Sequence, residues 1–294
     1  MKTFRYWAKA SERVQKADRT WNLECYGGSN KNLEEALERA ADRARAAAAA
    51  IALGQDPQQY AYSDRPVREE IVREIEHNGE TVAVLTRNAY GSLILNSPRV
   101  LFADIDYPPQ GGFHLPGFLL SMIGAVAKLF GQESRATQHA GQSPDEKIVD
   151  RVRRLVDETA GLGVRLYRTT HGFRGLVTTG TWDPLAPETL RLLTDFGSDP
   201  LYVTLCKAQE CFRARVSPKP WRCRAPKPPS RFPWPDSGVE QEYREWEKTY
   251  EKIAAGYSTC AFIDAFGSSD IAPEVEPVLR LHDELACAGD GPIA

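Results

Sequence analysis

Two aspartates at alternate positions are the first candidates for chemistry in this sequence. Asp104 and Asp106 end the apolar run Val100–Asp106, which predicts a buried strand. Alternate residues of a strand point to the same face, so both carboxylates should lie together. Neighbouring carboxylates repel each other, and a divalent cation removes that repulsion. The pattern is equally typical of a strand end whose acids face water, and it also occurs in nucleases and metal-dependent glycosyltransferases.

A second candidate follows in the segment Arg168–Arg174, which reads Arg-Thr-Thr-His-Gly-Phe-Arg. Gly172 favours a tight turn between two strands. Basic side chains and turn N–H groups near a metal could bind a triphosphate. In this segment Arg174 supplies a basic side chain, and Thr169 supplies a hydroxyl. A solvated turn with surface arginines is the alternative, and His171 alone is typical of a surface turn residue.

The third candidate is a basic segment. Between residues 206 and 231 there are eight lysines and arginines and one acid. A strand at its start would place Arg213 and Arg215 on one face. Such a stripe can hold phosphates, and aromatic rings can stack on bases; the interleaved rings are Trp221, Phe232 and Trp234. Alternatively, this is a proline-rich loop whose arginines pair with the acidic helix expected over Glu240–Glu251.

In this order the three blocks resemble the archaeo-eukaryotic primase superfamily, especially its primase-polymerases. That superfamily has an apolar-Asp-apolar-Asp/Glu strand, which residues 103–106 match. Residues 169–174 have the length and the second glycine of the family's Ser-Gly-x-Gly-x-His motif. Asp199 resembles the third acid of the family. Phe212-Arg213 and Ser217-Pro218-Lys219 resemble its downstream positions that contact the nucleotide. The resemblance covers residues 67–219, about half of the chain.

The resemblance implies a metal-dependent nucleotidyltransferase that adds nucleotides to a 3′-hydroxyl on a DNA or RNA template and releases pyrophosphate. Asp104, Asp106 and Asp199 would be the catalytic acids and would hold one or two Mg²⁺ or Mn²⁺ ions. The partners would be nucleoside triphosphates, a template, and proteins of replication, repair or defence. The nucleotide-binding residues would be Thr169, Arg174, Arg213, Arg215, Ser217 and Lys219.

Two positions depart from the family pattern. Arg174 occupies the histidine position, and an arginine binds phosphate without acting as histidine does. This departure favours an alternative, a non-catalytic nucleotide- or nucleic-acid-binding module with the same fold. Asp199 follows Ser198 rather than an apolar residue; Ile263-Asp264 fits better locally but lies after the basic segment, so Asp264 is the substitute third acid. The paired aspartates alone also leave a metal-dependent nuclease open.

The mixture of hairpin and helix signals predicts an α+β fold. By resemblance, this would be a primase-polymerase-like core with an RRM-like half and a helical N-terminal part. We expect an N-terminal hairpin and long helix packed on the core (1–66), the metal and nucleotide core (67–235), and a helix-strand-helix that completes the core (236–294).

Local signals place the individual elements. Asn32 caps a helix over 33–53, and Asn78-Gly79 predicts a hairpin. Ser143 and Pro144 begin another helix, and Gly197 ends one that starts at Pro187. After Asp199 the chain is predicted to be strand-like. Further helices are expected over 119–130, 240–255 and 273–286, with strands over 164–168, 173–179 and 259–263.

Composition excludes several classes of protein. The net charge is −3 and 42% of residues are hydrophobic, close to the average for folded soluble proteins. No apolar run approaches the ~20 residues that span a bilayer, and the N-terminus has no apolar signal core. We therefore expect a cytoplasmic protein without a membrane partner. The six cysteines form no Cys-x-x-Cys pair, which favours reduced thiols; a zinc site from Cys206, Cys211 and Cys223 is the lesser alternative.

Overall fold

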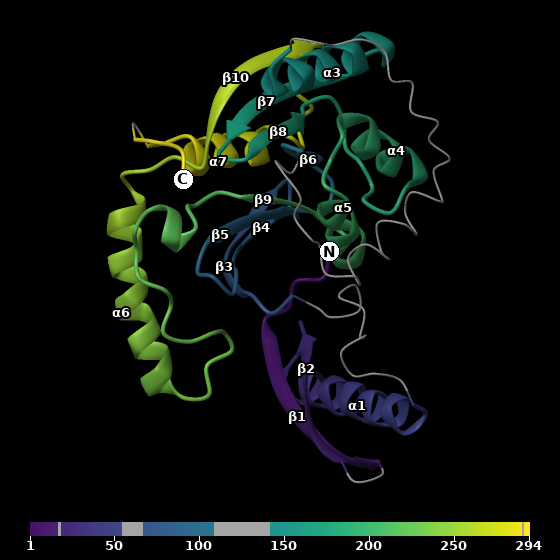
Figure 1. The fold of residues 1–294 in the computed structure, drawn as a ribbon, viewed down its shortest axis with the longest axis vertical. Helices are drawn as coiled ribbons and strands as arrows, with labels where there is room; N and C mark the ends of the chain where they lie inside the picture. Colours follow the sequence, from purple (N-terminus) through teal and green to yellow (C-terminus); the bar gives the residue numbers. More distant parts are fainter. Residues whose placement is uncertain (17–18, 55–66, 109–141, 290) are drawn as a thin grey trace.

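The computed structural model describes residues 1–16, 19–54, 67–108, 142–289 and 291–294, and it confirms the mixed α+β class. Its described strands form three antiparallel sheets, of two, four and four strands. Figure 1 shows the two four-stranded sheets close together and the N-terminal hairpin projecting from them with its helix. The helix expected over 119–130 lies outside the described residues.

The N-terminal unit is a long hairpin covered by one helix. The predicted N-terminal hairpin is present: strands β1 (Tyr6–Lys16) and β2 (Arg19–Ser29) pair along their whole length. Helix α1 (Leu33–Ala52) begins as predicted, with the Asn32 side chain accepting from the Glu35 amide. Its alanine face packs close to the hairpin, since a Cβ at Gly27 would lie 2.3 Å from the Ala36 carbonyl oxygen.

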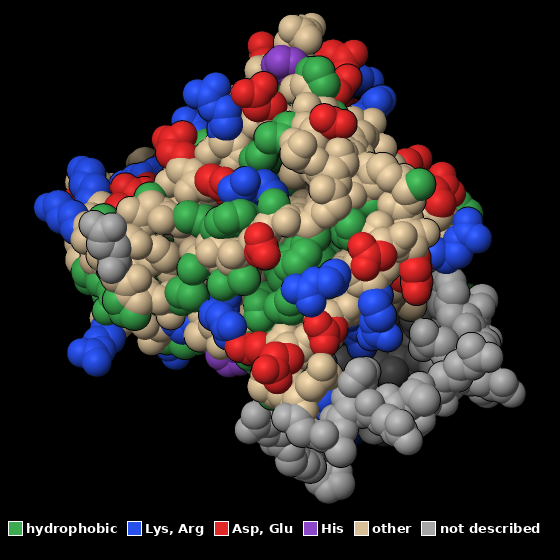
Figure 2. Space-filling model, turned by 90° about the horizontal axis from the view of Figure 1, so that it is seen from above, with side chains coloured by type: hydrophobic (Ala, Val, Ile, Leu, Met, Phe, Trp, Pro, Cys, Tyr) green, Lys and Arg blue, Asp and Glu red, His purple; other side chains and the backbone are tan. Residues whose placement is uncertain are grey.

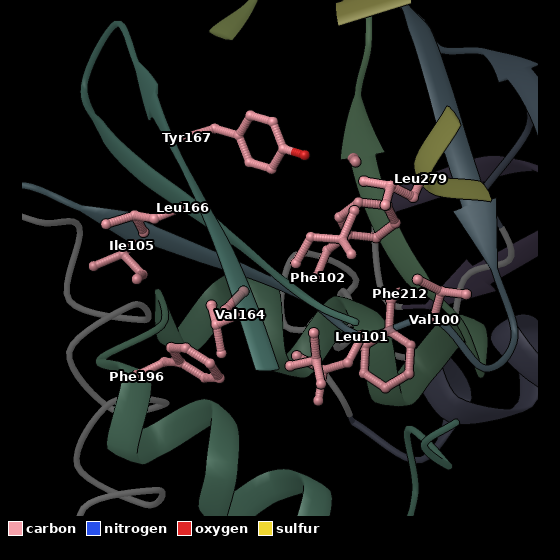
Figure 3. Packing of buried hydrophobic residues seen from close by; sticks show 14 of the residues in the cluster. Val100, Leu101, Phe102, Ile105, Val164, Leu166, Tyr167, Phe196, Phe212 and Leu279 are labelled. Carbon is pink, nitrogen blue, oxygen red and sulfur yellow. The ribbon is translucent and has the colours of Figure 1, made fainter. Parts of the chain in front are cut away.

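The first four-stranded sheet has the order β10-β7-β8-β6. Ala103 faces Phe196 of helix α4, whereas Phe102 faces His282 of helix α7, so these helices cover opposite faces. Figure 3 shows Phe196 close to Val164 on the α4 side. The strands are β6 (Phe102–Asp106), β7 (Gly163–Thr169), β8 (Gly172–Val177) and β10 (Cys260–Gly267); the helices are α3 (Pro144–Glu158), α4 (Pro187–Phe196) and α7 (Glu276–Ala286).

The second four-stranded sheet has the order β3-β4-β5-β9. The predicted hairpin at Asn78-Gly79 is confirmed, and both residues have the positive φ angles that a two-residue turn requires (52° and 80°). The strands are β3 (Glu70–His77), β4 (Glu80–Arg87), β5 (Leu93–Ser97) and β9 (Phe212–Arg215).

The strand-like prediction after Asp199 is wrong over its first part. Residues Pro200–Gln209 form helix α5, with proline in its first turn and the Asp199 side chain as its N-cap. The buried positions Tyr202, Cys206 and Gln209 instead follow helical spacing. The chain then enters β9, as predicted, and a short 3₁₀ helix, η3 (Pro220–Arg222).

Helix α6 (Ser237–Ala254) supports a second, aromatic core. It starts three residues before the expected position because Asp236 caps it. Trp246 stacks on Tyr250 with ring centroids 5.2 Å apart. Its ion pairs involve Arg87 and Arg244 and not the predicted arginines of the basic segment, among the pairs found in the described residues.

The two four-stranded sheets meet at their edge strands β6 and β9. The Tyr202 hydroxyl donates to the Phe102 carbonyl of β6 (2.8 Å) and accepts from the Arg213 amide of β9 (3.3 Å). One buried side chain of α5 therefore links the two sheets. This junction brings the acids of β6 close to the arginines of β9.

The remaining local predictions are mostly confirmed. The Ser143 capping box and the Gly197 end of α4 form as expected. Strand β10 is longer than predicted, and α7 begins later, at Glu276. Among the described helices, none combines the length and apolar character needed to cross a lipid bilayer. Figure 2 shows acidic and basic side chains interspersed on the face seen from above, so neither sign coats it.

Candidate functional site

The paired aspartates lie on one face of β6, as their spacing predicts. Asp104 is directly opposite Arg174 of β8, and Asp106 is opposite Gly172. A side chain at Gly172 would place its Cβ 2.0 Å from the Ile105 carbonyl oxygen, so only glycine allows this close approach. The hairpin of β7 and β8 therefore positions Arg174 beside the acids.

Asp199 joins these two acids from the start of α5. Its backbone N–H donates to the Asp104 carbonyl oxygen (2.8 Å), and its carboxylate accepts from the Leu201 amide (3.1 Å). Asp264 lies on β10, at the other edge of the sheet, where it is exposed and accepts from the Ala265 amide. The structure thus places Asp199, and not Asp264, beside the paired aspartates.

The carboxylates crowd one another. Burial raises the pKa of Asp104, and the charge of Asp199 raises it further, whereas Arg174 opposes the shift. Partial burial, Asp104 and Asp199 raise the pKa of Asp106 to about 6. The neighbouring bases therefore offset the burial and the mutual repulsion of these carboxylates only in part.

Arg174 is almost fully buried and fixed in direction. Its Nη1 donates to the Arg215 carbonyl oxygen (3.0 Å) and to Nε2 of His282 (3.1 Å). Because arginine only donates, Nε2 accepts, and Nδ1 of His282 carries the proton and donates to Asp283 (3.0 Å). Neither His282 nor Asp283 was among the residues predicted from the sequence. The available signal was a histidine among the apolar positions of the last helix.

Positive charges crowd one another on the other side of the site. Burial, Arg174 and Arg222 lower the pKa of Arg215 to about 10. Burial, Arg215 and Arg222 also lower the pKa of Lys219. Arg222 donates to Nδ1 of His171 (3.0 Å), which brings the predicted turn histidine to this cluster. Arg222 was counted in the basic segment but was not assigned to the site.

Other predicted nucleotide-binding residues lie elsewhere or have partners. Nη2 of Arg213 contacts both carboxylate oxygens of buried Glu69 (2.7 and 2.9 Å) and not the acids of β6. The Ser217 hydroxyl accepts from the Leu93 amide (2.8 Å) and bonds Tyr250 (2.7 Å). Thr169 lies half-buried at the end of β7, opposite Gly172, in line with Asp106 across the sheet.

The carboxylates of Asp104, Asp106 and Asp199 match the oxygen ligands that Mg²⁺ and Mn²⁺ prefer. A bound cation would also remove the repulsion that raises the pKa of Asp106. In the part of the chain that the structure describes, no group of three or more His, Cys, Asp or Glu side chains is arranged so that it could hold a metal ion. The three carboxylates fit a divalent cation by their chemistry and not by a ligand geometry that is already present.

The cysteines give no support to the zinc hypothesis. Burial raises the pKa of Cys206 to about 12 and that of Cys211 to about 11, so both are protonated thiols at neutral pH. The Cys223 thiol donates to the Pro220 carbonyl oxygen (3.4 Å). All three are free and buried, as expected for structural thiols.

Comparisons with protein-family models, with curated proteins and with solved structures found no match for this chain. The resemblance to primases therefore stays a prediction from the sequence motifs. The charged site at the junction of β6, β8, β9 and α5 is the structural feature from which a function can be argued.

Proposed function

We propose that this chain is a metal-dependent nucleotidyltransferase of primase-polymerase type. One observation carries the proposal: a crowded set of carboxylates and a crowded set of basic groups meet at one site. Burial and neighbouring carboxylates raise the pKa of Asp104 and Asp106, and burial and neighbouring bases lower the pKa of Arg215 and Lys219. A complex of a divalent cation with a triphosphate would relieve both repulsions, because it presents a positive and a negative part together.

The chain's own residues take distinct roles in this proposal. Asp104, Asp106 and Asp199 would hold the cation. Bound there, a divalent cation supplies activation of a 3′-hydroxyl and neutralisation of the departing pyrophosphate. Arg215 and Lys219 would bind the triphosphate oxygens. Arg174, held by His282, would keep a fixed positive charge opposite Asp104, and such preorganised charge lowers the barrier without reorganisation.

The order of elements matches the finer fold expectation only in part. Helix α3 follows β6, and β8 lies between β6 and β7, as in a split βαβ unit. Strand β10, however, pairs with β7 and not with β6, whereas the last strand of a ferredoxin-like sheet pairs with the first. The RRM-like half and the primase-polymerase-like core therefore belong to the proposal on the strength of the sequence motifs.

The test is a titration of a labelled nucleoside triphosphate in Mn²⁺ and in EDTA. We expect binding that needs both the metal and Asp104, so that Asp104→Ala abolishes it. Asp264→Ala is the matched control, since it removes an exposed aspartate from the other edge of the same sheet. Circular dichroism checks that both variants are folded. Binding that is absent in every metal condition, or that is insensitive to Asp104→Ala, would refute the proposal.

Nucleotide binding without turnover is the second candidate, and the environment of Arg174 favours it. This side chain replaces the family's histidine, and its Nη1 already donates to His282 and to a carbonyl oxygen. An arginine there cannot exchange a proton near neutral pH. Extension of a primed template by bound nucleotide distinguishes the two candidates, because the binding module would retain nucleotide and yield no longer product.

A further inference from the structure

Two exposed aromatic rings stand together beside the charged site. Trp221 of η3 is 52% exposed, and Tyr90, from the turn between β4 and β5, is 51% exposed. Their ring centroids are 5.3 Å apart and their planes are nearly perpendicular. The edge of one ring therefore supports the other, and large areas of both remain in contact with solvent.

The buried aromatic core under α6 holds both loops in place. The Tyr250 hydroxyl donates to the Pro218 carbonyl oxygen (2.6 Å), which fixes the loop leading to Trp221. The turn that carries Tyr90 packs on the same core, since a Cβ at Gly91 would lie 2.1 Å from the Trp246 ring. The two exposed rings are therefore attached to one rigid base, which lowers the entropy cost of binding a ligand.

Positive charge borders the ring pair on the side of the acids. The Lys219 ammonium lies 5.5 Å from the centroid of the Trp221 ring. The positive charges of Lys219 and Arg222 also oppose the rise in the pKa of Asp106. The bases of this loop therefore lie toward the acids, whereas the indole of Trp221 is exposed to solvent. Aromatic surface next to phosphate-binding charge is the combination that single-stranded nucleic acids require.

The other rings of the basic segment are used differently. Trp234 packs between Phe232 and Tyr243, with centroids 5.2 and 5.1 Å away. Arg244 covers its ring at 4.7 Å. Of the three aromatic residues interleaved with the basic residues, Trp221 is therefore the one whose ring is not enclosed by the α6 core.

We propose that Trp221, supported by Tyr90, stacks on an unpaired base of a single-stranded nucleic acid whose backbone passes Lys219 and Arg222. This inference rests on the proposed function, because it assigns the template strand to a surface that borders the nucleotide site. Stacking accepts any base, so the contact provides affinity without reading sequence.

The test measures binding of fluorescent oligo-dT and oligo-U to the full chain by anisotropy, at low salt and in EDTA. Trp221→Ala should weaken binding about 5- to 150-fold, the range expected for loss of one stacked base. Trp221→Phe should restore most of the affinity. Tyr6→Ala is the control, since Tyr6 is 42% exposed on the distant hairpin. Equal affinity of Trp221→Ala and the unmodified chain, or no binding by the unmodified chain, would overturn the proposal.

Two further measurements distinguish this inference from duplex binding and from the proposed function. Binding of a blunt duplex should not depend on Trp221, and an equal loss for duplex and single strand would overturn the assignment to an unpaired base. Nucleotide binding in Mn²⁺ should survive Trp221→Ala. If nucleotide binding proves independent of Asp104 while oligonucleotide binding still needs Trp221, the proposed function fails and the stacking surface remains.

Discussion

Arg213 and Arg215 lie two residues apart on β9, yet their surroundings differ in a way that separates structure from function. Arg213 meets both oxygens of buried Glu69, which also accepts from the Thr86 hydroxyl (2.5 Å). Within the described residues, Arg215 donates to the carbonyl oxygens of Ser217 and Ala294 and lies near Arg174 and Arg222, with Asp104 as the nearby negative charge. One positive charge is neutralised by a buried carboxylate, whereas the other lies among further bases, as the proposed nucleotide site requires.

This difference shows that the type and spacing of charged residues do not identify a binding residue. What identifies it is whether its charge is already paired with an opposite charge inside the fold. A buried ion pair with complete hydrogen bonding fixes the position of a strand, and removing one member leaves an uncompensated charge. Like charges that lie close together have the opposite effect. Their repulsion lowers the stability of the ligand-free protein, and a ligand of opposite charge would reduce that repulsion. Each experiment below changes one member of these two environments.

The largest effect is expected from Glu69→Gln, which leaves the Arg213 charge buried without its counter-ion. We expect the free energy of unfolding to fall by about 3–5 kcal/mol in a urea titration. Glu69→Gln with Arg213→Met should recover much of this loss. Glu74→Gln, which removes the half-buried partner of exposed Arg5, should cost much less, because solvent screens this ion pair. Similar losses for Glu69→Gln and Glu74→Gln would remove the contrast.

His282→Phe tests whether Arg174 depends on its acceptor. Loss of a hydrogen bond to a charged group should reduce the free energy of unfolding by about 1.5–3 kcal/mol. Nucleotide affinity in Mn²⁺ should fall as well, because Arg174 would no longer be held opposite Asp104. His282→Gln can still accept, so it should rescue both quantities. A stability loss with unchanged nucleotide affinity would show that His282 only supports the core.

Arg215→Gln should separate binding from stability. Nucleotide affinity should fall about tenfold, as expected when one charge-assisted contact of ~1.4 kcal/mol is lost. The thermal midpoint should stay equal or rise, because the change relieves the repulsion by Arg174 and Arg222. A lower midpoint with full nucleotide affinity would place Arg215 in the same structural class as Arg213.

The smallest effect concerns Asp106, whose folded pKa of about 6 lies above its ordinary value. A raised pKa means that the folded state favours the protonated form, so stability is lost as the pH rises from the ordinary pKa of 3.8 to about 6, and the loss is complete above pH 6. Asp106→Asn should therefore raise the thermal midpoint by about 1–2 °C at pH 7.5, since solvent screens this exposed strand end. The gain should disappear below pH 4, and Mn²⁺ binding should weaken. A midpoint difference independent of pH would contradict this assignment.

Local signals were enough for much of the fold and for half of the site. Strand alternation predicted that Asp104 and Asp106 lie on one face, whereas the pairing of β8 with β6 that places Arg174 opposite Asp104 was not predicted from a local signal. The helix after Asp199 was missed because its apolar composition outweighed the cap and proline that begin it. The partners of Arg174 and Arg213 lie 108 and 144 residues away, and no local pattern encodes contacts across such separations.

The bond between Arg174 and His282 also has a consequence for biosynthesis. The 108 residues between them take about 5–20 s to translate at ~5–20 residues per second. During that interval the hairpin of β7 and β8 can form, while the helix that orients its arginine has yet to leave the ribosome. Assembly of the charged site is therefore a late event in the life of each new chain, and nascent chains pass through a stage in which the acids exist without their oriented counter-charge.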